Sequence, residues 1–482
     1  MRIKPISLLL RESAEQGENS LKRSLGPVNL ILIGIGIIIG AGLFSLTGIA
    51  AGQHSGPAVT ISFIIAALGC TFAALCYAEF SAMIPVAGSA YTYSYATMGE
   101  LFAWIIGWDL VLEYSVGAAT VAISWSQYLT KFLSWFDLYL PPQLVMSPFE
   151  TFRAADGQVL HGLINLPAAL IVILVTSVII RGTKGSALIN ALIVALKVGV
   201  VLTFIAVGWA YINPDNYHPY IPQNTGVWGE YGWSGVLRGA GLVFFVFIGF
   251  DAVSTAAQEA KNPQRNMPIG IIGSLVVCTV LFVLFAHVMT GMANYKEFIG
   301  SGAPVAIAIE KTNYAWLSKA VVLAILIGYL SVILVDLLGQ SRVFFSMSKD
   351  GLLPRIFSEV HPRFRTPWKS NILLCAFITL FAAFVPIRVV GEMTSIGTLL
   401  AFVMVCAGVL ILRKRQPHIA RPFKTPLVPL VPILGIMTCV AMMAFLPGDT
   451  WLRLLVWLAL GLAIYFLYGK KHSKLNRRDS KN

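Results

Sequence analysis

The first long apolar segment of the chain contains the stretch Ile33-Gly-Ile-Gly-Ile-Ile-Ile-Gly-Ala-Gly-Leu-Phe44. Four glycines in twelve residues weaken a helix and let its backbone open. A second interruption, Phe247-Ile-Gly-Phe-Asp251, places an acid after a glycine in the middle of another apolar run. Because aspartate is a favoured helix N-cap, we expect Asp251 to start a new half-helix there. The two stretches therefore predict two broken helices.

The interruptions fall in the first and sixth apolar segments, which are corresponding positions of two five-helix halves. Taken alone, the first stretch fits close helix packing equally well, since Gly36 and Gly40 have Gly-x-x-x-Gly spacing. Paired interruptions, however, are typical of secondary transporters built from an inverted repeat. The chain has 209 residues between Gly40 and Gly249 and 204 between Ala187 and Gly391, which agrees with such a repeat. No residue identity links the halves, so the repeat is inferred from topology alone.

The composition places the chain in a membrane. Of its 482 residues 57% are hydrophobic and 12% are charged, about half the charged share of soluble domains. Apolar runs long enough to cross about 30 Å of hydrocarbon recur along the chain. Twelve such runs begin near Val28, Pro57, Leu101, Leu163, Ala187, Val236, Ile269, Leu317, Ser370, Gly391, Leu427 and Trp451, the eighth being long and the ninth short. This pattern predicts an all-α polytopic membrane protein and excludes a soluble enzyme. No catalytic motif, metal-ligand spacing or cofactor signature interrupts it.

The basic excess follows the predicted topology. The chain has 35 Lys and Arg against 22 Asp and Glu, a net charge of +13. If the amino terminus is cytoplasmic, the inside segments hold 26 basic residues, the outside loops hold eight, and Lys197 lies within a membrane segment. This bias fits the positive-inside rule, so we expect both termini in the cytoplasm, a plasma-membrane location and no nucleic-acid partner. Lipid is therefore expected to surround most of the chain.

The expected organisation has three parts. Residues 1–27 form a cytoplasmic segment and residues 469–482 a basic cytoplasmic tail near anionic lipid. Between them, residues 28–468 form a twelve-helix transporter domain. We expect its first repeat over 28–211, its second over 236–412 and two extra helices over 427–468.

Four positions should share one layer of the membrane. Gly40, Glu113, Lys197 and Gly249 lie 10 to 13 residues past the starts of their segments. With a helical rise of 1.5 Å per residue, each is roughly 15–20 Å deep, near the middle of the hydrocarbon. An opened helix N-terminus there binds a carboxylate, and the carbonyl ends of the other half-helices suit an ammonium group. An α-amino acid supplies both groups.

Ionisable residues inside the membrane point to ion coupling. Lys197 is too deep to reach an interface, and we expect it to couple transport to protons. Glu113 is either its partner or proton acceptor, or a satisfied structural acid. Asp251 is favoured as a cap over a direct substrate contact. The sequence does not decide the role of Asp336, and His287 is favoured as a satisfied buried histidine over a proton relay.

With those residues identified, the chain resembles the amino acid, polyamine and organocation transporter superfamily, specifically bacterial members of its cationic amino acid transporter family. The resemblance covers nearly the whole chain. The segments that carry it are Gly34-Ile-Gly-Ile-Ile-Ile-Gly-Ala-Gly-Leu-Phe44, Cys76-Tyr-Ala-Glu-Phe80, Gly88-Ser-Ala-Tyr-Thr-Tyr-Ser-Tyr95, Gly107-Trp-Asp109, Gly249-Phe-Asp-Ala-Val-Ser254, Lys261-Asn-Pro-Gln-Arg265 and Lys349-Asp-Gly-Leu-Leu-Pro354.

The resemblance implies a leucine-transporter-type fold of two inverted five-helix repeats plus two helices, with alternating access. It places the substrate carboxylate on the backbone of Ile39, Gly40, Ala41 and Gly42, and the amino group on that of Phe245, Ile248 and Gly249. Lys197 matches the family's fifth-segment lysine, which favours proton over sodium coupling. Ala41 departs from the hydroxyl residue that similar proteins often carry, and Asp336 stands where relatives tend to be apolar. Both departures bear on the choice of substrate.

Three other readings remain beside proton-coupled amino acid symport. An amino acid exchanger is the alternative closest to symport. Separately, the sequence leaves open whether a small membrane subunit is a partner. A non-transporting amino acid sensor lacks a sizeable cytoplasmic domain for signalling. A channel is disfavoured because no carbonyl filter or ring of charges is found.

Overall fold

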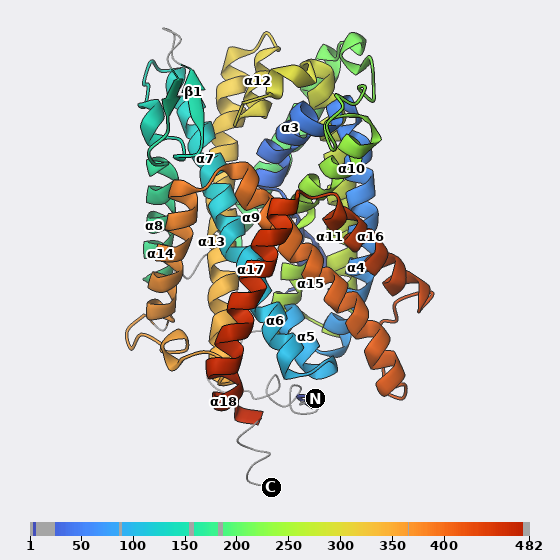
Figure 1. Cartoon of the computed structure of the whole chain (residues 1–482). Coiled ribbons are helices and arrows are strands. Elements are labelled where there is room, and N and C mark those ends of the chain that lie inside the picture. The colour runs from blue at the N-terminus through green and yellow to red at the C-terminus, as the bar shows by residue number, and fades with distance from the viewer. Residues whose placement is uncertain are drawn as a thin grey trace.

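The computed structural model describes residues 3–5, 25–85, 89–153, 159–181, 187–364 and 366–475. These residues form a bundle of helices that run mostly along one direction (Figure 1). Most of the expected amino-terminal segment, 1–27, and the last part of the basic tail, 469–482, lie outside the described residues.

The first half of the described chain contains the helices α2 (Pro27–Ile38), α3 (Thr47–Ala50), α4 (Val59–Met83), α5 (Ser89–Thr97), α6 (Glu100–Val111), α7 (Gly117–Ser134), α8 (Leu166–Ile180) and α9 (Ala187–Gly208). The second half contains α10 (Gly232–Val243), α11 (Pro263–Met292), α12 (Pro304–Glu310), α13 (Ala315–Lys349), α14 (Trp368–Phe384), α15 (Ile387–Arg415), α16 (Leu430–Ala444), α17 (Gly448–Ile464) and α18 (Lys470–His472). Short π-helical and 3₁₀ turns join or extend them, including η1 (Gly42–Leu46), η2 (Ala51–Ser55), η4 (Leu112–Val116), η7 (Pro214–Tyr217), η8 (Phe244–Phe247) and η9 (Asp251–Glu259).

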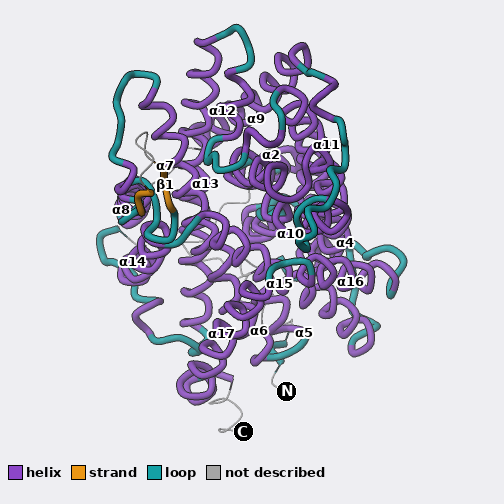
Figure 2. Tube along the Cα trace, turned by 45° about the horizontal axis from the view of Figure 1, so that its top comes forward, coloured by secondary structure: helices purple, strands orange, loops and turns teal. Residues whose placement is uncertain are grey.

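Strands make a very small part of the described chain (Figure 2). The strands β1 (Thr151–Arg153) and β2 (Val159–His161) pair antiparallel, with Phe152 opposite Leu160. They lie within the polar segment between α7 and α8, at the end of the bundle opposite α18 (Figure 1).

Eight continuous helical stretches of the described chain are long and apolar enough to cross a membrane, and four shorter apolar helices accompany them. The eighth expected segment is long, as predicted, since α13 has 35 residues, and the ninth is short, since α14 has 17. The chain is therefore a polytopic helical membrane protein.

The outside of the bundle is apolar. Large aliphatic side chains on α8, α9, α14, α16 and α17 are exposed, and they include Leu170, Leu174, Leu192, Leu380, Met437 and Leu455. A surface of this kind is unfavourable in water but matches lipid chains. Hydrocarbon is therefore the natural surrounding of these helices.

The two ends of the described chain meet at one end of the bundle (Figure 1). The Lys4 Nζ pairs with Asp350 Oδ1 at 3.1 Å, and the Lys474 amide donates to the Asp350 carbonyl at 3.0 Å. The two ends of the described chain thus lie at the same end of the bundle.

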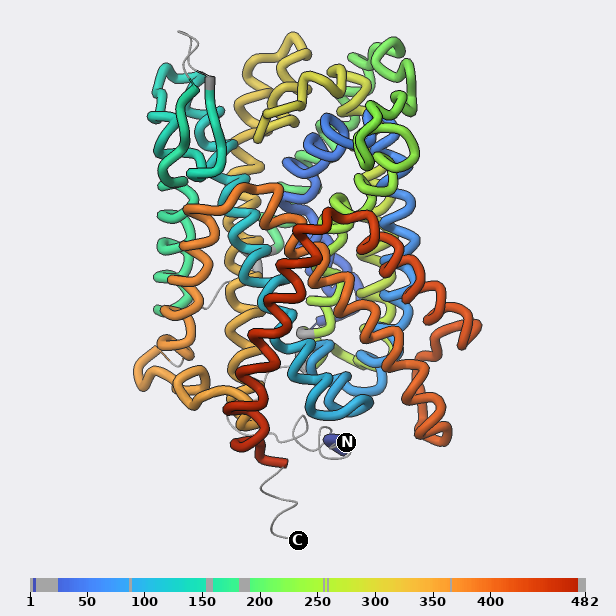
Figure 3. The backbone as a smooth tube through the Cα atoms, in the orientation of Figure 1, coloured from blue at the N-terminus to red at the C-terminus, as the bar shows by residue number. Residues whose placement is uncertain are grey.

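The interrupted segments lie side by side at the centre of the bundle (Figure 3). η1 contacts η8, and α2 contacts η9, although about 200 residues separate them in sequence. The half-helix after the first break is anchored by Ser45, whose hydroxyl lies 3.3 Å from that of Tyr329, and by Tyr128, whose hydroxyl donates to the Phe44 carbonyl. These two contacts fix the half-helix after the first break to α13 and α7.

Candidate functional site

The first break exposes backbone amides. α2 ends at Ile38, and the helix resumes so that its first hydrogen bond runs from the Phe44 amide to the Gly40 carbonyl at 3.2 Å. The amides of Ala41 and Gly42 precede that bond, so they have no acceptor within the helix. The structure confirms the interruption at this place, and the amides form the positive end of a half-helix.

The second break depends on Gly249. η8 ends at Phe247 and η9 begins at Asp251. Gly249 between them has φ of +120°, in a region that residues with a side chain rarely adopt. A new helical segment does begin at Asp251, as expected, but Asp251 is not its N-cap, because Phe250 occupies that position and no side chain caps the turn. Instead the Asp251 Oδ1 accepts a hydrogen bond from the Gly249 amide at 3.2 Å, which ties the acid back across the break.

The two breaks touch so closely that side chains at their glycines would collide. A Cβ on Gly42 would lie 2.6 Å from the Val246 Cα, and a Cβ on Gly249 would lie 2.6 Å from the Ile37 Cγ2. Gly40 differs, since its Cβ would meet only the Val332 side chain, at 3.3 Å. Gly42 and Gly249 therefore permit the close approach of the two breaks, whereas Gly40 packs against α13.

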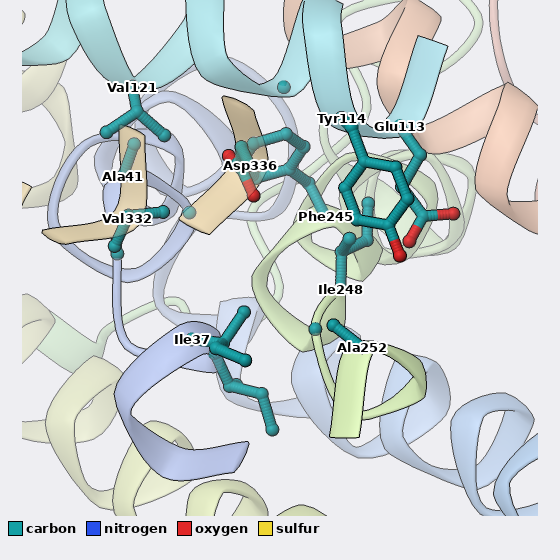
Figure 4. Close-up of a pocket in the computed structure, with 15 residues that line it drawn as sticks. Ile37, Ala41, Glu113, Tyr114, Val121, Phe245, Ile248, Ala252, Val332 and Asp336 are labelled. Atoms are coloured by element: carbon teal, nitrogen blue, oxygen red, sulfur yellow. The ribbon is translucent and has the colours of Figure 1, made fainter. Parts of the chain in front are cut away.

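A small cavity of about 30 Å³ lies between the breaks (Figure 4). Space of this size holds about two water molecules, so a larger ligand needs the lining side chains to move apart. Six of the expected substrate-binding residues line it, namely Gly40, Ala41, Gly42, Phe245, Ile248 and Gly249. The other two, Ile39 and Asp251, are fully buried and are not among the lining residues.

The rest of the lining was not anticipated from the sequence, apart from Glu113. Gly117 and Val121 continue the face of Glu113 at intervals of four residues, and Val332 stands four residues before Asp336. This spacing puts each set on one helix face and is a signal that the sequence does contain. The remaining members are Ile37, Ile38, Tyr114 and Ala252. The cavity is thus largely apolar, with two carboxyls and a phenol.

Glu113 and Asp251 form a pair of buried acids. Glu113 is 2% exposed and Asp251 is fully buried, and the two carboxyls are in hydrogen-bonding range of each other. Neither Glu113 oxygen finds a donor among the described residues. A hydrogen bond between the two acids therefore needs a proton on one of them, because two carboxylates in contact repel. The pair is a place where one proton can be held.

Lys197 supports the first break from outside the cavity. Its Nζ donates to the Gly36 carbonyl at 2.7 Å, in the last turn of α2, and the side chain is 2% exposed. A cation at the carbonyl end of a helix is favourable. The acid whose charge acts on Lys197 is Asp336. Of the two alternatives left open for Glu113, a hydrogen bond to Lys197 is not found among the described residues, and Glu113 lies beside Asp251.

His287 lies away from the breaks, in contact with η7. The Tyr217 ring stacks on the imidazole with centroids 4.8 Å apart, and the Tyr217 hydroxyl donates to the His287 carbonyl at 2.8 Å. Burial raises the pKa of Tyr217 to about 12, so its hydroxyl keeps its proton at neutral pH. This packing agrees with a structural histidine.

With this geometry established, comparison with known proteins identifies the family. The sequence profile of the family described as amino acid permease matches residues 25–464. The chain belongs to the amino acid permease family. This membership confirms the resemblance seen in the motifs.

Three relatives of this permease carry names that refer to different substrates. The branched-chain amino acid permease BcaP of Bacillus subtilis is 46% identical over 465 residues, covering 96% of this chain and 97% of the relative. The methylthioribose transporter of the same species is 43% identical over 476 residues, covering 99% of each. The vacuolar cationic amino acid transporter 4 of Arabidopsis thaliana is 35% identical over 411 residues, covering 83% of this chain and 65% of the relative. These relatives are permeases and transporters, so the permease is not an enzyme.

Proposed function

We propose that this permease is a secondary transporter that carries α-amino acids across the plasma membrane by alternating access. The observation that carries the proposal is the cavity enclosed by the two facing helix breaks. It offers free amides on one side and helix carbonyl ends on the other, the two complements of an amino acid's charged groups. Family membership supports the same substrate class.

In this proposal the substrate carboxylate binds the amides of Ala41 and Gly42. The ammonium group binds the carbonyl ends of α2 and η8, near Ile248. The substrate side chain then occupies the apolar part of the cavity, between Val121 and Val332. Each helix end carries roughly half an elementary charge, so both the carboxylate and the ammonium group of a zwitterion bind favourably.

The proposal includes a twelve-helix topology with inverted repeats over 28–211 and 236–412, followed by two helices over 427–468. The support is the pair of breaks in corresponding segments, which is the usual place of the binding site in such repeats. Both termini are then cytoplasmic, in line with the positive-inside distribution.

Proton coupling is the proposed energy source. Two observations support it: Lys197 bonds the last turn of α2, and the Glu113–Asp251 pair can hold a proton next to the second break. Movement of either break between inward and outward states alters these contacts. Binding of substrate and of a proton then become linked, as coupling requires.

A second candidate substrate is methylthioribose. The transporter of that name matches nearly every residue of this chain, and the carboxyls of Glu113 and Asp336 are acceptors for sugar hydroxyls. Such a substrate has no carboxylate for the first break, so the amide-rich geometry favours an amino acid.

The test is uptake into sodium-free proteoliposomes from a panel of labelled alanine, leucine, arginine and methylthioribose, with an outside-acid pH gradient present or absent. Gradient-driven uptake of an amino acid that unlabelled methylthioribose does not inhibit is the expected result. Uptake that needs an internal amino acid instead identifies an exchanger. Uptake of methylthioribose alone refutes amino acid transport.

A further inference from the structure

Asp336 is a carboxylate in the cavity without a hydrogen-bond donor. It lies on α13, one turn after Val332, and is partly exposed where it lines the cavity. Among the residues that the structure describes, none donates a hydrogen bond to it. Gly117 faces it from α7, and even an added Cβ there would stay 3.9 Å from the Asp336 Oδ2. Glycine at position 117 thus leaves this side of the carboxylate uncovered, whereas a larger residue would contact it.

Two further polar groups line the same cavity without partners. The Glu113 carboxyl and the Tyr114 hydroxyl are both more than nine-tenths buried. Among the described residues the Tyr114 hydroxyl has no hydrogen-bond partner, and Glu113 has only the neighbouring acid Asp251. In Figure 4 these side chains and Asp336 occupy the upper half of the view, whereas Ile37 and Ala252 lie below. Buried polar groups normally have partners, so orphaned ones in a cavity indicate that a ligand supplies them.

The position of Asp336 suits the far end of a substrate. Gly40, at the first break, faces Val332 at 3.3 Å, measured from an added Cβ. Asp336 is one helical turn further along α13, or about 5.4 Å. A substrate held by its carboxylate at the break therefore needs a side chain of only a few atoms to reach Asp336.

Lys197 does not supply the hydrogen-bond donor that Asp336 lacks. Its charge acts on Asp336, but its Nζ is bonded to the Gly36 carbonyl and the residue is not part of the cavity lining. The lysine is therefore engaged with α2, and it leaves the Asp336 carboxyl free toward the cavity. A methyl group placed against that carboxylate displaces water without replacing its hydrogen bonds, which is unfavourable.

We infer that Asp336 makes this permease select substrates whose far end carries a hydrogen-bond donor, an ammonium or a hydroxyl group, over substrates of the same shape that end in a methyl group. The inference rests on the proposed function, since it names the side-chain class for the same site. Ammonium and hydroxyl donors share this chemistry, and the experiment separates them.

The test uses three amino acids that differ only in one terminal group. Norvaline, homoserine and 2,4-diaminobutyrate end in methyl, hydroxyl and ammonium groups on side chains of equal length. Each competes against labelled alanine for uptake into proteoliposomes, and methylthioribose is added as a hydroxyl-bearing competitor that is not an amino acid. The variants are Asp336→Asn and Asp336→Leu, and Asp215→Asn, an exposed acid in η7, is the matched control.

In the wild type and the control, we expect at least one donor-bearing analogue to compete about 10-fold or more better than norvaline, which corresponds to about 1.4 kcal/mol. Asp336→Leu should reverse the preference, and Asp336→Asn should keep part of the hydroxyl preference and lose the ammonium preference. Equal competition by all three analogues in the wild type overturns the inference, and this result does not depend on how the variants fold. An unchanged ratio in Asp336→Leu overturns it as well.

Alanine uptake separates this inference from the proposed function. Its methyl side chain is too short to reach Asp336, so alanine transport persists if the inference fails and amino acid transport is correct. If the wild type takes up no amino acid of the panel, the proposed function itself fails.

Discussion

Replacement of Gly249 by alanine tests whether the second helix break needs a residue without a side chain. The backbone there has φ of +120°, and the new Cβ would lie 2.6 Å from the Ile37 Cγ2 and 3.3 Å from the Ile38 amide nitrogen. Strained φ of this kind costs about 1–3 kcal/mol. Overpacking of a buried contact costs about 1–3 kcal/mol more. The variant should therefore lose roughly 2–6 kcal/mol of stability.

Two variants separate the strain from the collision. Adding Ile37→Ala removes the atom that the new Cβ meets, so the double variant should recover the packing part and retain the backbone part. Gly199→Ala is the matched control, since Gly199 lies in membrane helix α9 with no atom within 4 Å of an added Cβ. The control should be neutral or slightly more stable, by about 0.5–1 kcal/mol, because alanine favours a helix.

The assays are thermal unfolding of the detergent-purified protein and initial rates of uptake in proteoliposomes. Gly249→Ala should unfold several degrees below wild type and lose most uptake, because the cavity wall moves with the break. If Gly249→Ala matches Gly199→Ala in both measurements, the break does not require glycine, and the geometry assigned to it is incorrect.

Three other substitutions probe the charges. Lys197→Met removes the cation bonded to α2 and should abolish gradient-driven uptake while homoexchange of substrate continues; equal gradient-driven uptake by the variant contradicts proton coupling through this lysine. Glu113→Gln replaces the carboxyl with an amide that can still donate a hydrogen bond to Asp251 but cannot exchange a proton, so the variant should fold normally and show a flattened pH dependence of uptake. An unaltered pH profile disproves the role of the acid pair in proton coupling. Glu79→Gln breaks a buried ion pair in which Arg413 Nη2 lies 2.7 Å from the carboxylate, and should destabilise the protein by about 1.5–3 kcal/mol in thermal unfolding. In that last case adding Arg413→Gln should recover part of the loss, and no recovery shows that the pair contributes little.

The sequence could locate much of the candidate site because its signals are local. Each helix break depends on glycines within one apolar run, and a charge such as Lys197 is conspicuous in an apolar segment. Six of eight expected binding residues line the cavity for this reason. The depth of each residue also follows from its distance along a helix, which is fixed at 1.5 Å per residue.

The sequence could not decide which groups face each other. A membrane helix is apolar on nearly all sides, so no amphipathic stripe reveals which face points inward. The pairing of Glu113 with Asp251 and the contact of Lys197 with the Gly36 carbonyl depend on the rotation of helices packed from distant parts of the chain. The turn that brings the Asp251 carboxylate back to Gly249 likewise depends on the local path of the chain after the break.

The amino acid sequence by itself determined that the chain is a helical membrane protein and where two of its helices break. These properties follow from hydrophobicity and from backbone preference, which each short segment carries independently of the rest. Only the tertiary structure decided that Asp336 enters the cavity and that Asp251 does not line it. Such facts are set by the packing of one helix against another, and packing is a property of the assembled bundle.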